Sequence, residues 1–330
     1  MTFRKIISAV DAHTAGEPVR IIQGNGLGIK GDTLAEKKDY LKTNMDYIRT
    51  SLMLEPRGHR DMFGAVLVEP QSKEAALGVI FMDASGYLDM CGHGTMGVAT
   101  VAIETGLIES KKTILIDTPA GIVTARPEVK GSRVVNVTIR NVPSFLYEKR
   151  ILEVEGVGSL PVEISFGGNF FALVEARDLS LSVKKQRLQE IISTGLRVKE
   201  AANKHVEVHH PFLDINSIDL VEISDKPINP EADDRNVVVF GEGLVDRSPC
   251  GTGTCAKMAV LYAGGRLSLN ERFVHESIIG TTFTGKVVSE TRVDRFKAVV
   301  PEITGSSFIT DIHHLIIEPD DPLKHGFILR

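Results

Sequence analysis

The chain has 330 residues, of which 42% are hydrophobic and 25% charged, and its formal net charge at pH 7 is −5. This composition indicates a globular protein of about two domains, and the absence of a Lys/Arg run disfavours a nucleic-acid partner. The apolar runs are strand-sized and too short to cross a bilayer. Three cysteines are too few, and odd in number, for a secreted disulfide framework, so we expect a cytoplasmic protein with reduced thiols.

The predicted elements are mostly strands. In chain order, a helix is expected over residues 32–53, where apolar residues from Leu34 to Leu52 recur near a 3.6-residue period. A second helix is expected over 179–203. Strand-like runs rich in β-branched residues surround them, namely AVLVEP, GVIFM, TILIDT, VVNVTI, DLVEI, NVVVF, KVVSE and HLIIE. Turn residues separate these runs, which indicates a strand-rich fold with few helices.

One motif occurs twice. The pattern C-G-x-G-T stands at 91–95 and again at 250–254, about half the chain apart. Each copy has a phenylalanine ten residues before its cysteine and a glycine fifteen residues after it. A strand-like run precedes each copy, and a helix-like run that ends at the glycine follows it. This repeated motif with matching flanks indicates a duplicated half-unit.

The helix-like runs at 96–105 and 255–263 are apolar almost all round, and such a helix is normally buried on every side. In a strand-rich chain the natural cover is a curved sheet. We therefore predict an α+β fold of two pseudo-symmetric halves, each a barrel-like, mostly antiparallel sheet around a central apolar helix.

A Cys-Gly-x-Gly-Thr helix start is suited to hold an anion. Its glycines admit close approach of the backbone, and first-turn N–H groups are unpaired donors at the positive end of the helix dipole. Thr95 and Thr254 are candidate caps or extra donors. The same setting should stabilise a cysteine thiolate. Neither copy matches a P-loop or a dinucleotide fingerprint, so a carboxylate is the better anion.

Two such cysteines facing one carboxylate-bearing substrate suggest a reaction. One thiolate can remove the Cα proton, and the other residue, as a thiol, can return a proton to the opposite face. Helix N–H groups would stabilise the charge that develops on the carboxylate. Cys91 and Cys250 are thus the candidate acid/base pair for cofactor-independent racemisation or epimerisation.

These motifs resemble those of the proline racemase family, within the diaminopimelate-epimerase-like fold. The resemblance extends over nearly the whole chain, through MCGHGT, DRSPCGTGT and the segments at 11–20, 53–66, 164–172, 275–285 and 321–329. It implies a PLP-independent isomerase with an active site in the cleft between the halves, no metal, and a homodimer. We place the crossings between the halves near RNVPSF and AVVPEI, which gives a first half-domain of 1–139 plus 298–330 and a second of 140–297. The resemblance implies that the C-terminal tail returns to the first half.

The resemblance also implies roles for individual residues. Cysteine at both positions favours a racemase or 2-epimerase over the trans-3-hydroxyproline dehydratases, which carry Thr or Ser at the first position. Phe63 and Phe240 would face the pyrrolidine ring, and that apolar wall favours proline over 4-hydroxyproline as the substrate. Asp246 would hold the ring nitrogen. The other expected substrate-binding residues are Gly92, His93, Thr95, Gly251 and Thr252.

Other interpretations of the same residues stay open. The nearest is a 4-hydroxyproline 2-epimerase. A second is a thiol metal-binding or redox protein that uses Cys91, Cys250 and Cys255, and a third is a non-catalytic amino-acid binder. Cys255 lies inside an apolar helix and is expected to be structural. His275 is as easily a structural hydrogen-bonding residue as a functional one.

Overall fold

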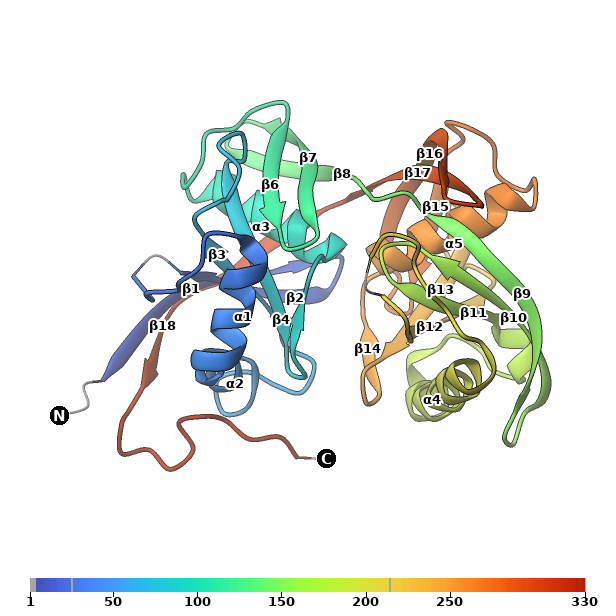
Figure 1. Ribbon diagram of the computed structural model, residues 1–330, viewed down its shortest axis with the longest axis horizontal. Coiled ribbons are helices and arrows are strands. Elements are labelled where there is room, and N and C mark those ends of the chain that lie inside the picture. Colours follow the sequence, from blue (N-terminus) through green and yellow to red (C-terminus); the bar gives the residue numbers. More distant parts are fainter. Residues whose placement is uncertain (1–3, 25, 214, 330) are drawn as a thin grey trace. The chain divides into compact units, whose positions relative to one another are not determined.

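The computed structural model describes residues 4–24, 26–213 and 215–329 (Figure 1). It divides into two compact units, Met1–Ile139 with Ser306–Arg330, and Arg140–Gly305. The chain therefore re-enters unit 1 after Gly305, later than the crossing at 297/298 that the sequence suggested. The reason is strand pairing, because β17 (Phe296–Gly305) pairs along most of its length with β16 (Thr282–Val293) of unit 2.

Unit 1 is built around one mixed sheet. Its strands are β1 (Lys5–Thr14), β2 (Glu17–Gln23), β3 (Phe63–Val68), β4 (Leu77–Asp83), β5 (Tyr87–Leu88), β6 (Ile114–Thr118), β7 (Gly121–Lys130), β8 (Arg133–Arg140, whose last residue opens unit 2) and β18 (Ser307–Ile317). Its helices are α1 (Leu34–Asn44), α2 (Asp46–Met53) and α3 (Gly92–Glu104). The C-terminal strand β18 pairs antiparallel with β1, which ties the returning tail to this unit.

Unit 2 is built in the same way. Besides β16 and β17, its strands are β9 (Phe145–Val154), β10 (Gly158–Phe166), β11 (Phe170–Glu175), β12 (Ile218–Asp225), β13 (Asp234–Phe240), β14 (Leu244–Asp246) and β15 (Phe273–Ser277). Its helices are α4 (Leu188–His205) and α5 (Gly251–Ala263), with short 3₁₀ turns η1 (Ala176–Leu179) and η2 (Lys185–Arg187).

The strand pairing confirms the duplicated fold. In unit 1, β2–β3 is parallel, β3–β4 antiparallel, β4–β5 antiparallel and β4–β6 parallel. In unit 2, β11–β12, β12–β13, β13–β14 and β13–β15 repeat that sequence of directions. The helix that follows the short strand is α3 in the first unit and α5 in the second. The α+β class, the mostly antiparallel sheets and the two related halves are as predicted.

Both central helices are buried as expected. Every residue from Gly92 to Ala102 in α3 is buried, and so is every residue from Gly251 to Val260 in α5. Helix α5 contacts strands β9, β10, β11, β16 and β17, so the sheet of unit 2 curves around it. Helix α3 is enclosed in the same manner by β1, β2, β3, β7 and β18. Burial of these apolar faces is the main favourable term for each unit.

Three helix predictions needed adjustment. The segment 32–53 forms two helices, because Met45 leaves the helical region at φ −137°. The helix expected over 179–203 starts only at Leu188, after a turn in which Ser180 has φ 53°. Helices α3 and α5 begin at Gly92 and Gly251, earlier than expected, so the C-G-x-G-T residues form the first helical turn and not a preceding loop. Across the described residues no helix is both long and apolar enough to span a membrane.

Candidate active site

Each motif cysteine is the N-cap of its central helix. Cys91 precedes α3 in an extended conformation. Both the N–H and the hydroxyl of Thr95 donate to the Cys91 carbonyl, at 3.0 and 2.6 Å. Thr254 likewise closes the first turn of α5 by donating its N–H to the Cys250 carbonyl at 2.8 Å. The expectation that the threonines cap the helices is wrong, because the N-cap residues are the two cysteines, and their other expected role, as extra donors, stays a prediction.

In unit 1 the structure brings three predicted site residues together. The Sγ atom of Cys91 lies 3.1 Å from Nδ1 of His93, one residue into the helix. The ring of Phe63, from β3, meets the His93 ring edge-on with centroids 4.5 Å apart. Phe63 and His93 are buried, whereas Cys91 is half-buried. The Cys91 thiol thus lies at the more exposed end of an edge-on pair of rings.

In unit 2 Cys250 is held in an unusual conformation. Its φ is 58° and its ψ 113°, a region that a residue with a Cβ rarely adopts. Its N–H donates to Ser248 Oγ at 3.1 Å, and its Sγ accepts from the Gly253 N–H at 3.4 Å. The hydroxyl of Thr252 lies 3.7 Å from the same sulfur. The sulfur therefore folds back over the first turn of α5.

The ionisation of Cys250 differs from the expectation of a stabilised thiolate. Burial raises the pKa of Cys250 well above its usual value, and the nearby charge of Asp246 raises it further. The Gly253 N–H acts in the opposite direction but does not compensate. Removal from water penalises the charged form more than one helix terminus stabilises it. Cys250 accordingly rests as a thiol.

The remaining predicted residues of unit 2 lie on the hairpin before α5. Val238 of β13 faces Asp246 of β14, and Phe240 faces Leu244. One oxygen of the buried Asp246 accepts from the N–H and the hydroxyl of Ser248, at 2.8 and 2.7 Å. Phe240 is half-buried at the strand end. The hairpin thus fixes a carboxylate, and through Ser248 also the N–H of Cys250.

The second glycine of each motif has a packing role that sequence reasoning missed. A Cβ on Gly94 would lie 2.7 Å from the Phe81 ring, and one on Gly253 would lie 2.5 Å from a carboxylate oxygen of Glu222. These positions face inward, so glycine is needed for the helix start to reach the sheet. The first glycines, Gly92 and Gly251, open the helices, where first-turn N–H groups lack intrahelical acceptors.

Sequence reasoning also missed a buried polar group beneath Cys250. Glu222, Asn236 and His275 are fully buried on neighbouring strands β12, β13 and β15. The available signal was a glutamate inside the apolar strand run DLVEI. His275 is a hydrogen-bonding residue, with Nδ1 3.0 Å from the Thr254 hydroxyl.

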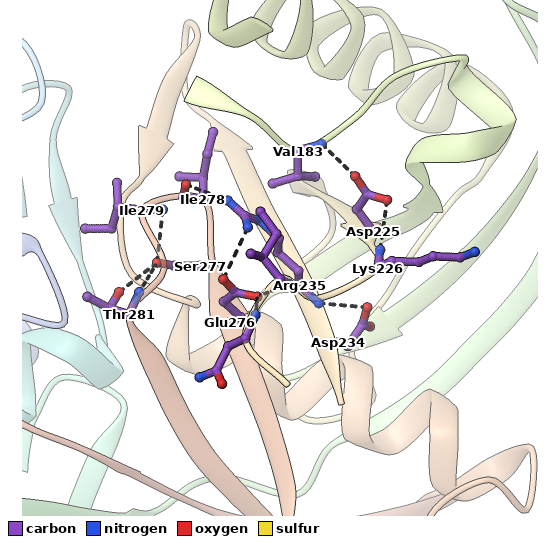
Figure 2. Close-up of polar contacts among 12 residues, drawn as sticks. Val183, Asp225, Lys226, Asp234, Arg235, Glu276, Ser277, Ile278, Ile279 and Thr281 are labelled. Atoms are coloured by element: carbon purple, nitrogen blue, oxygen red, sulfur yellow. Dashed lines mark hydrogen bonds and ion pairs between the residues drawn. The ribbon is translucent and has the colours of Figure 1, made fainter. Parts of the chain in front are cut away.

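The loop after β15 is anchored by a second polar group. Figure 2 shows the buried ion pair between Arg235 and Glu276, with 3.2 Å between Nη1 and Oε1. Arg235 also donates to the Ile278 carbonyl at 2.9 Å. The Ser277 hydroxyl then accepts from the N–H groups of Ile279 and Thr281. This loop belongs to one of the segments that resemble the family.

The other motif-linked groups are structural. Cys255 is fully buried, and none of the three cysteines forms a disulfide. Lys257 is buried and its ammonium contacts Asp234 and Ser224, each at 2.8 Å. Within the described ranges no group of three or more His, Cys, Asp or Glu side chains could hold a metal ion.

Comparison with known proteins decides the family. The family model described as proline racemase matches residues 9–328. The chain belongs to the proline racemase family. It is 50% identical to a proline racemase of Acetoanaerobium sticklandii, with 99% of each chain covered. It is 49% identical to that of Clostridioides difficile, with both chains fully covered.

A solved structure of a related enzyme has the same fold. The structure of a hydroxyproline epimerase from Agrobacterium vitis, with bound trans-4-hydroxy-L-proline, superposes with a TM-score of 0.92 and 31% identity, covering 100% of this chain and 96% of that one. Membership of the proline racemase family makes the chain an isomerase of the racemase and epimerase class.

Proposed function

We propose that this chain interconverts L-proline and D-proline without a cofactor, with Cys91 and Cys250 as the acid/base pair. The observation that carries the proposal is the matched placement of two cysteines, each the N-cap of the buried helix of its own unit. The 49–50% identity to proline racemases over the whole chain supports the substrate.

The proposed reaction moves one proton at each face of Cα. A thiolate takes the Cα proton, which breaks the C–H bond and forms an S–H bond, while the opposite thiol gives its proton to Cα. The negative charge that develops on the substrate carboxylate is stabilised by first-turn N–H groups, including those of Gly92 and Gly251. The two cysteines end in exchanged protonation states. The mechanism requires both units to bring their thiols to one substrate.

The local chemistry of the two cysteines supports an unequal resting pair. Burial raises the pKa of Cys250, which suits the proton-donating thiol. Cys91 is half-buried with His93 Nδ1 at 3.1 Å, and an adjacent imidazole can take up the proton of a thiol. We therefore assign Cys91 as the resting thiolate and Cys250 as the resting thiol.

We attribute substrate choice to the polarity of the proposed pocket. An apolar wall of Phe63 and Phe240 would reward burial of ring CH₂ groups by about 0.8 kcal/mol each. A ring hydroxyl left without a partner against that wall costs about 1–3 kcal/mol. Asp246 would hold the secondary ammonium, and His93, Thr95 and Thr252 complete the proposed contacts.

One observation favours a second candidate, 4-hydroxyproline 2-epimerisation. The solved relative with bound trans-4-hydroxy-L-proline shares this fold over the whole chain. The same pair of thiols could perform that reaction. The ratio of kcat/KM for proline to that for 4-hydroxyproline separates the two, and a clear preference for hydroxyproline would reverse the assignment.

We further propose that the enzyme acts as a homodimer in the cytoplasm. Three free thiols support a reducing compartment. The family resemblance implies the dimer. Light scattering of the purified protein tests this oligomeric state.

The decisive experiment is a chiral assay on purified, reduced protein. Either enantiomer of proline should relax to the racemate with no added cofactor, and in D₂O the product should carry deuterium at Cα. Cys91→Ser and Cys250→Ser should each lower the rate about 100- to 10,000-fold, since each face needs its own acid/base group. Substantial activity in either variant would refute the two-base assignment.

A further inference from the structure

The buried polar group beneath α5 lies on one face of the unit 2 sheet. Glu222 faces Val238 across β12 and β13, and Asn236 stands two residues from Val238 on the same face. Asn236 pairs with Ser277 of β15, and His275 stands two residues from Ser277. The three side chains therefore point to the same side, beneath the helix start that carries Cys250.

Four polar atoms in this group have no hydrogen-bond partner among the described residues. They are both carboxylate oxygens of Glu222, the side-chain oxygen of Asn236 and Nε2 of His275. All three residues are fully buried. An unpaired buried polar atom destabilises the folded protein, so four together need an explanation. With Glu222 ionised and no hydrogen on Nε2 of His275, all four atoms are acceptors, and the group lacks a hydrogen.

The hydrogen-bond pattern indicates where a hydrogen belongs. The Thr254 hydroxyl donates its one hydrogen to the Pro249 carbonyl at 3.1 Å. His275 Nδ1, 3.0 Å from that hydroxyl, must then carry a hydrogen and donate it to Thr254. This leaves His275 Nε2 as an acceptor, 3.8 Å from Glu222 Oε1. A protonated Glu222 supplies the missing donor, directly after a small side-chain shift or through one bridging water.

The charges around the group support a neutral acid. Burial, together with the nearby charges of Asp234 and Glu175, raises the pKa of Glu222 to about 8, although Lys257 and the Asn236 side chain act in the opposite direction. Burial lowers the pKa of His275 well below its usual value, with Lys257 acting in the same direction. Both shifts favour the uncharged forms of the two side chains. Of the other charged groups near this helix start, Asp246 acts on Cys250 from β14.

The chain of contacts ends on the peptide that carries Cys250. The Pro249 carbonyl accepts from the Thr254 hydroxyl and also from the Asn236 side chain, the latter at 2.8 Å. It belongs to the Pro249–Cys250 peptide. A strained backbone such as that of Cys250, at φ 58°, persists only where its surroundings hold it. The two hydrogen bonds to the Pro249 carbonyl hold this backbone in place.

We propose that Glu222, as a buried carboxylic acid, acts through His275 and Thr254 to hold the Pro249–Cys250 peptide, and is thereby a positioning residue for Cys250. The inference rests on the proposed function, in which Cys250 is one of the two acid/base groups. Glu222 transfers no proton to the substrate. It keeps the thiol folded over the first turn of α5, and its negative charge, once ionised, opposes the Cys250 thiolate.

The test compares the reactivity of two thiols in one sample. Alkylation of Cys250 and Cys91 by iodoacetamide is followed against pH by peptide mass spectrometry, and Cys91, in unit 1, is the internal reference. Glu222→Gln retains an N–H donor toward His275 and cannot ionise. We expect it to racemise proline within about threefold of wild type at pH 7, and to alkylate Cys250 about threefold faster above pH 8. The Cys91 rates should not change.

Two further variants test the path through Thr254. Thr254→Val removes the hydroxyl at nearly constant volume and should lower kcat about tenfold or more with little change in KM, while Thr254→Ser should restore most of it. Unchanged Cys250 alkylation in both Glu222→Gln and Thr254→Val would overturn the proposal, as would equal activity of the Val and Ser variants.

The alkylation readout does not depend on turnover, so the two proposals can fail separately. Shifted Cys250 reactivity in a protein that does not racemise proline would support the positioning role and refute the proposed function. Normal racemisation of proline with unchanged Cys250 alkylation would support the proposed function and refute the positioning role.

Discussion

His93 Nδ1 lies 3.1 Å from Cys91 Sγ, whereas the Sγ of Cys250 is met by the Gly253 backbone N–H at 3.4 Å. The two motif copies thus give their cysteines different partners, an imidazole in one and a peptide N–H in the other. The variable position of C-G-x-G-T also differs, because it is His in the first copy and Thr in the second, where the Thr252 hydroxyl lies 3.7 Å from the Cys250 sulfur. An imidazole can exchange a proton with the thiol, and a peptide N–H cannot.

We predict that His93→Gln lowers kcat/KM for proline about 100-fold, because Cys91 loses the group that accepts its proton. When the alkylation rate is followed against pH, the midpoint of the Cys91 profile should move to higher pH, whereas the Cys250 profile should not change. His314→Gln is the matched control, since His314 lies on the exposed face of β18 and contacts Ser8. An unchanged Cys91 alkylation profile in His93→Gln would contradict the assigned role of the imidazole.

The inward glycines predict a stability effect. Gly94→Ala and Gly253→Ala would place a Cβ 2.7 and 2.5 Å from their neighbours, and should each destabilise the protein by about 1–3 kcal/mol. Gly86→Ala is the control, because a Cβ there meets nothing within 4 Å. Urea denaturation of the three variants measures the differences. Equal stability of Gly253→Ala and Gly86→Ala would mean that the helix start is not packed against Glu222.

The motif repeat made much of this arrangement predictable. Two related halves, two buried central helices and a cysteine at each helix start all follow from C-G-x-G-T and its flanks. Helix boundaries did not, because Cys91 and Cys250 act as N-caps although neither is a usual capping residue type. The raised pKa of Cys250 was equally inaccessible, since it depends on burial beneath a sheet that only tertiary packing defines.

The partners of Cys250 show the same limit. Glu222, Asn236 and His275 come from three separate strands, and no spacing in the sequence links them to residue 250. A glutamate in an apolar strand signals a buried carboxyl, but not which helix lies above it.

Glu222 also predicts how stability depends on pH. Its pKa is raised in the folded state from 4.5 to about 8, so between these values the folded protein holds a proton that the unfolded chain has lost. Its contribution to stability is fully present below pH 4.5 and is lost as the pH rises to about 8. Urea denaturation should show the free energy of unfolding falling across this window more steeply in wild type than in Glu222→Gln. Parallel curves would show that Glu222 is ionised in the folded protein.

The buried charge of Lys257, on α5, gives a prediction about stability. Its ammonium is buried and pairs with Asp234 at 2.8 Å. Lys257→Met would leave Asp234 without its cation in a largely buried place, so we expect a loss of about 3–5 kcal/mol in the free energy of unfolding. Adding Asp234→Asn should recover part of that loss, because the uncompensated charge is removed.

Lys149→Met, which breaks an exposed pair with Glu163, should cost about 0–1 kcal/mol. A Lys257→Met effect no larger than that of Lys149→Met would show that the buried pair contributes little.

The proposed wall of Phe63 and Phe240 gives a prediction about substrate preference. Phe63 lies against His93 and is buried, while Phe240 is half-buried at the end of β13, so Phe240 can be replaced with less disturbance of the fold. Phe240→Ser would remove apolar surface that favours ring CH₂ groups and supply a hydroxyl able to pair with a ring hydroxyl. We expect the ratio of kcat/KM for proline to that for trans-4-hydroxy-L-proline to fall about 10- to 100-fold, from about 1–3 kcal/mol of discrimination. Because the free-solution equilibrium constant between the proline enantiomers is one, kcat/KM for L- and D-proline must stay equal in every variant, which checks the assay. A ratio unchanged by Phe240→Ser would place the wall elsewhere and remove the pocket argument for proline.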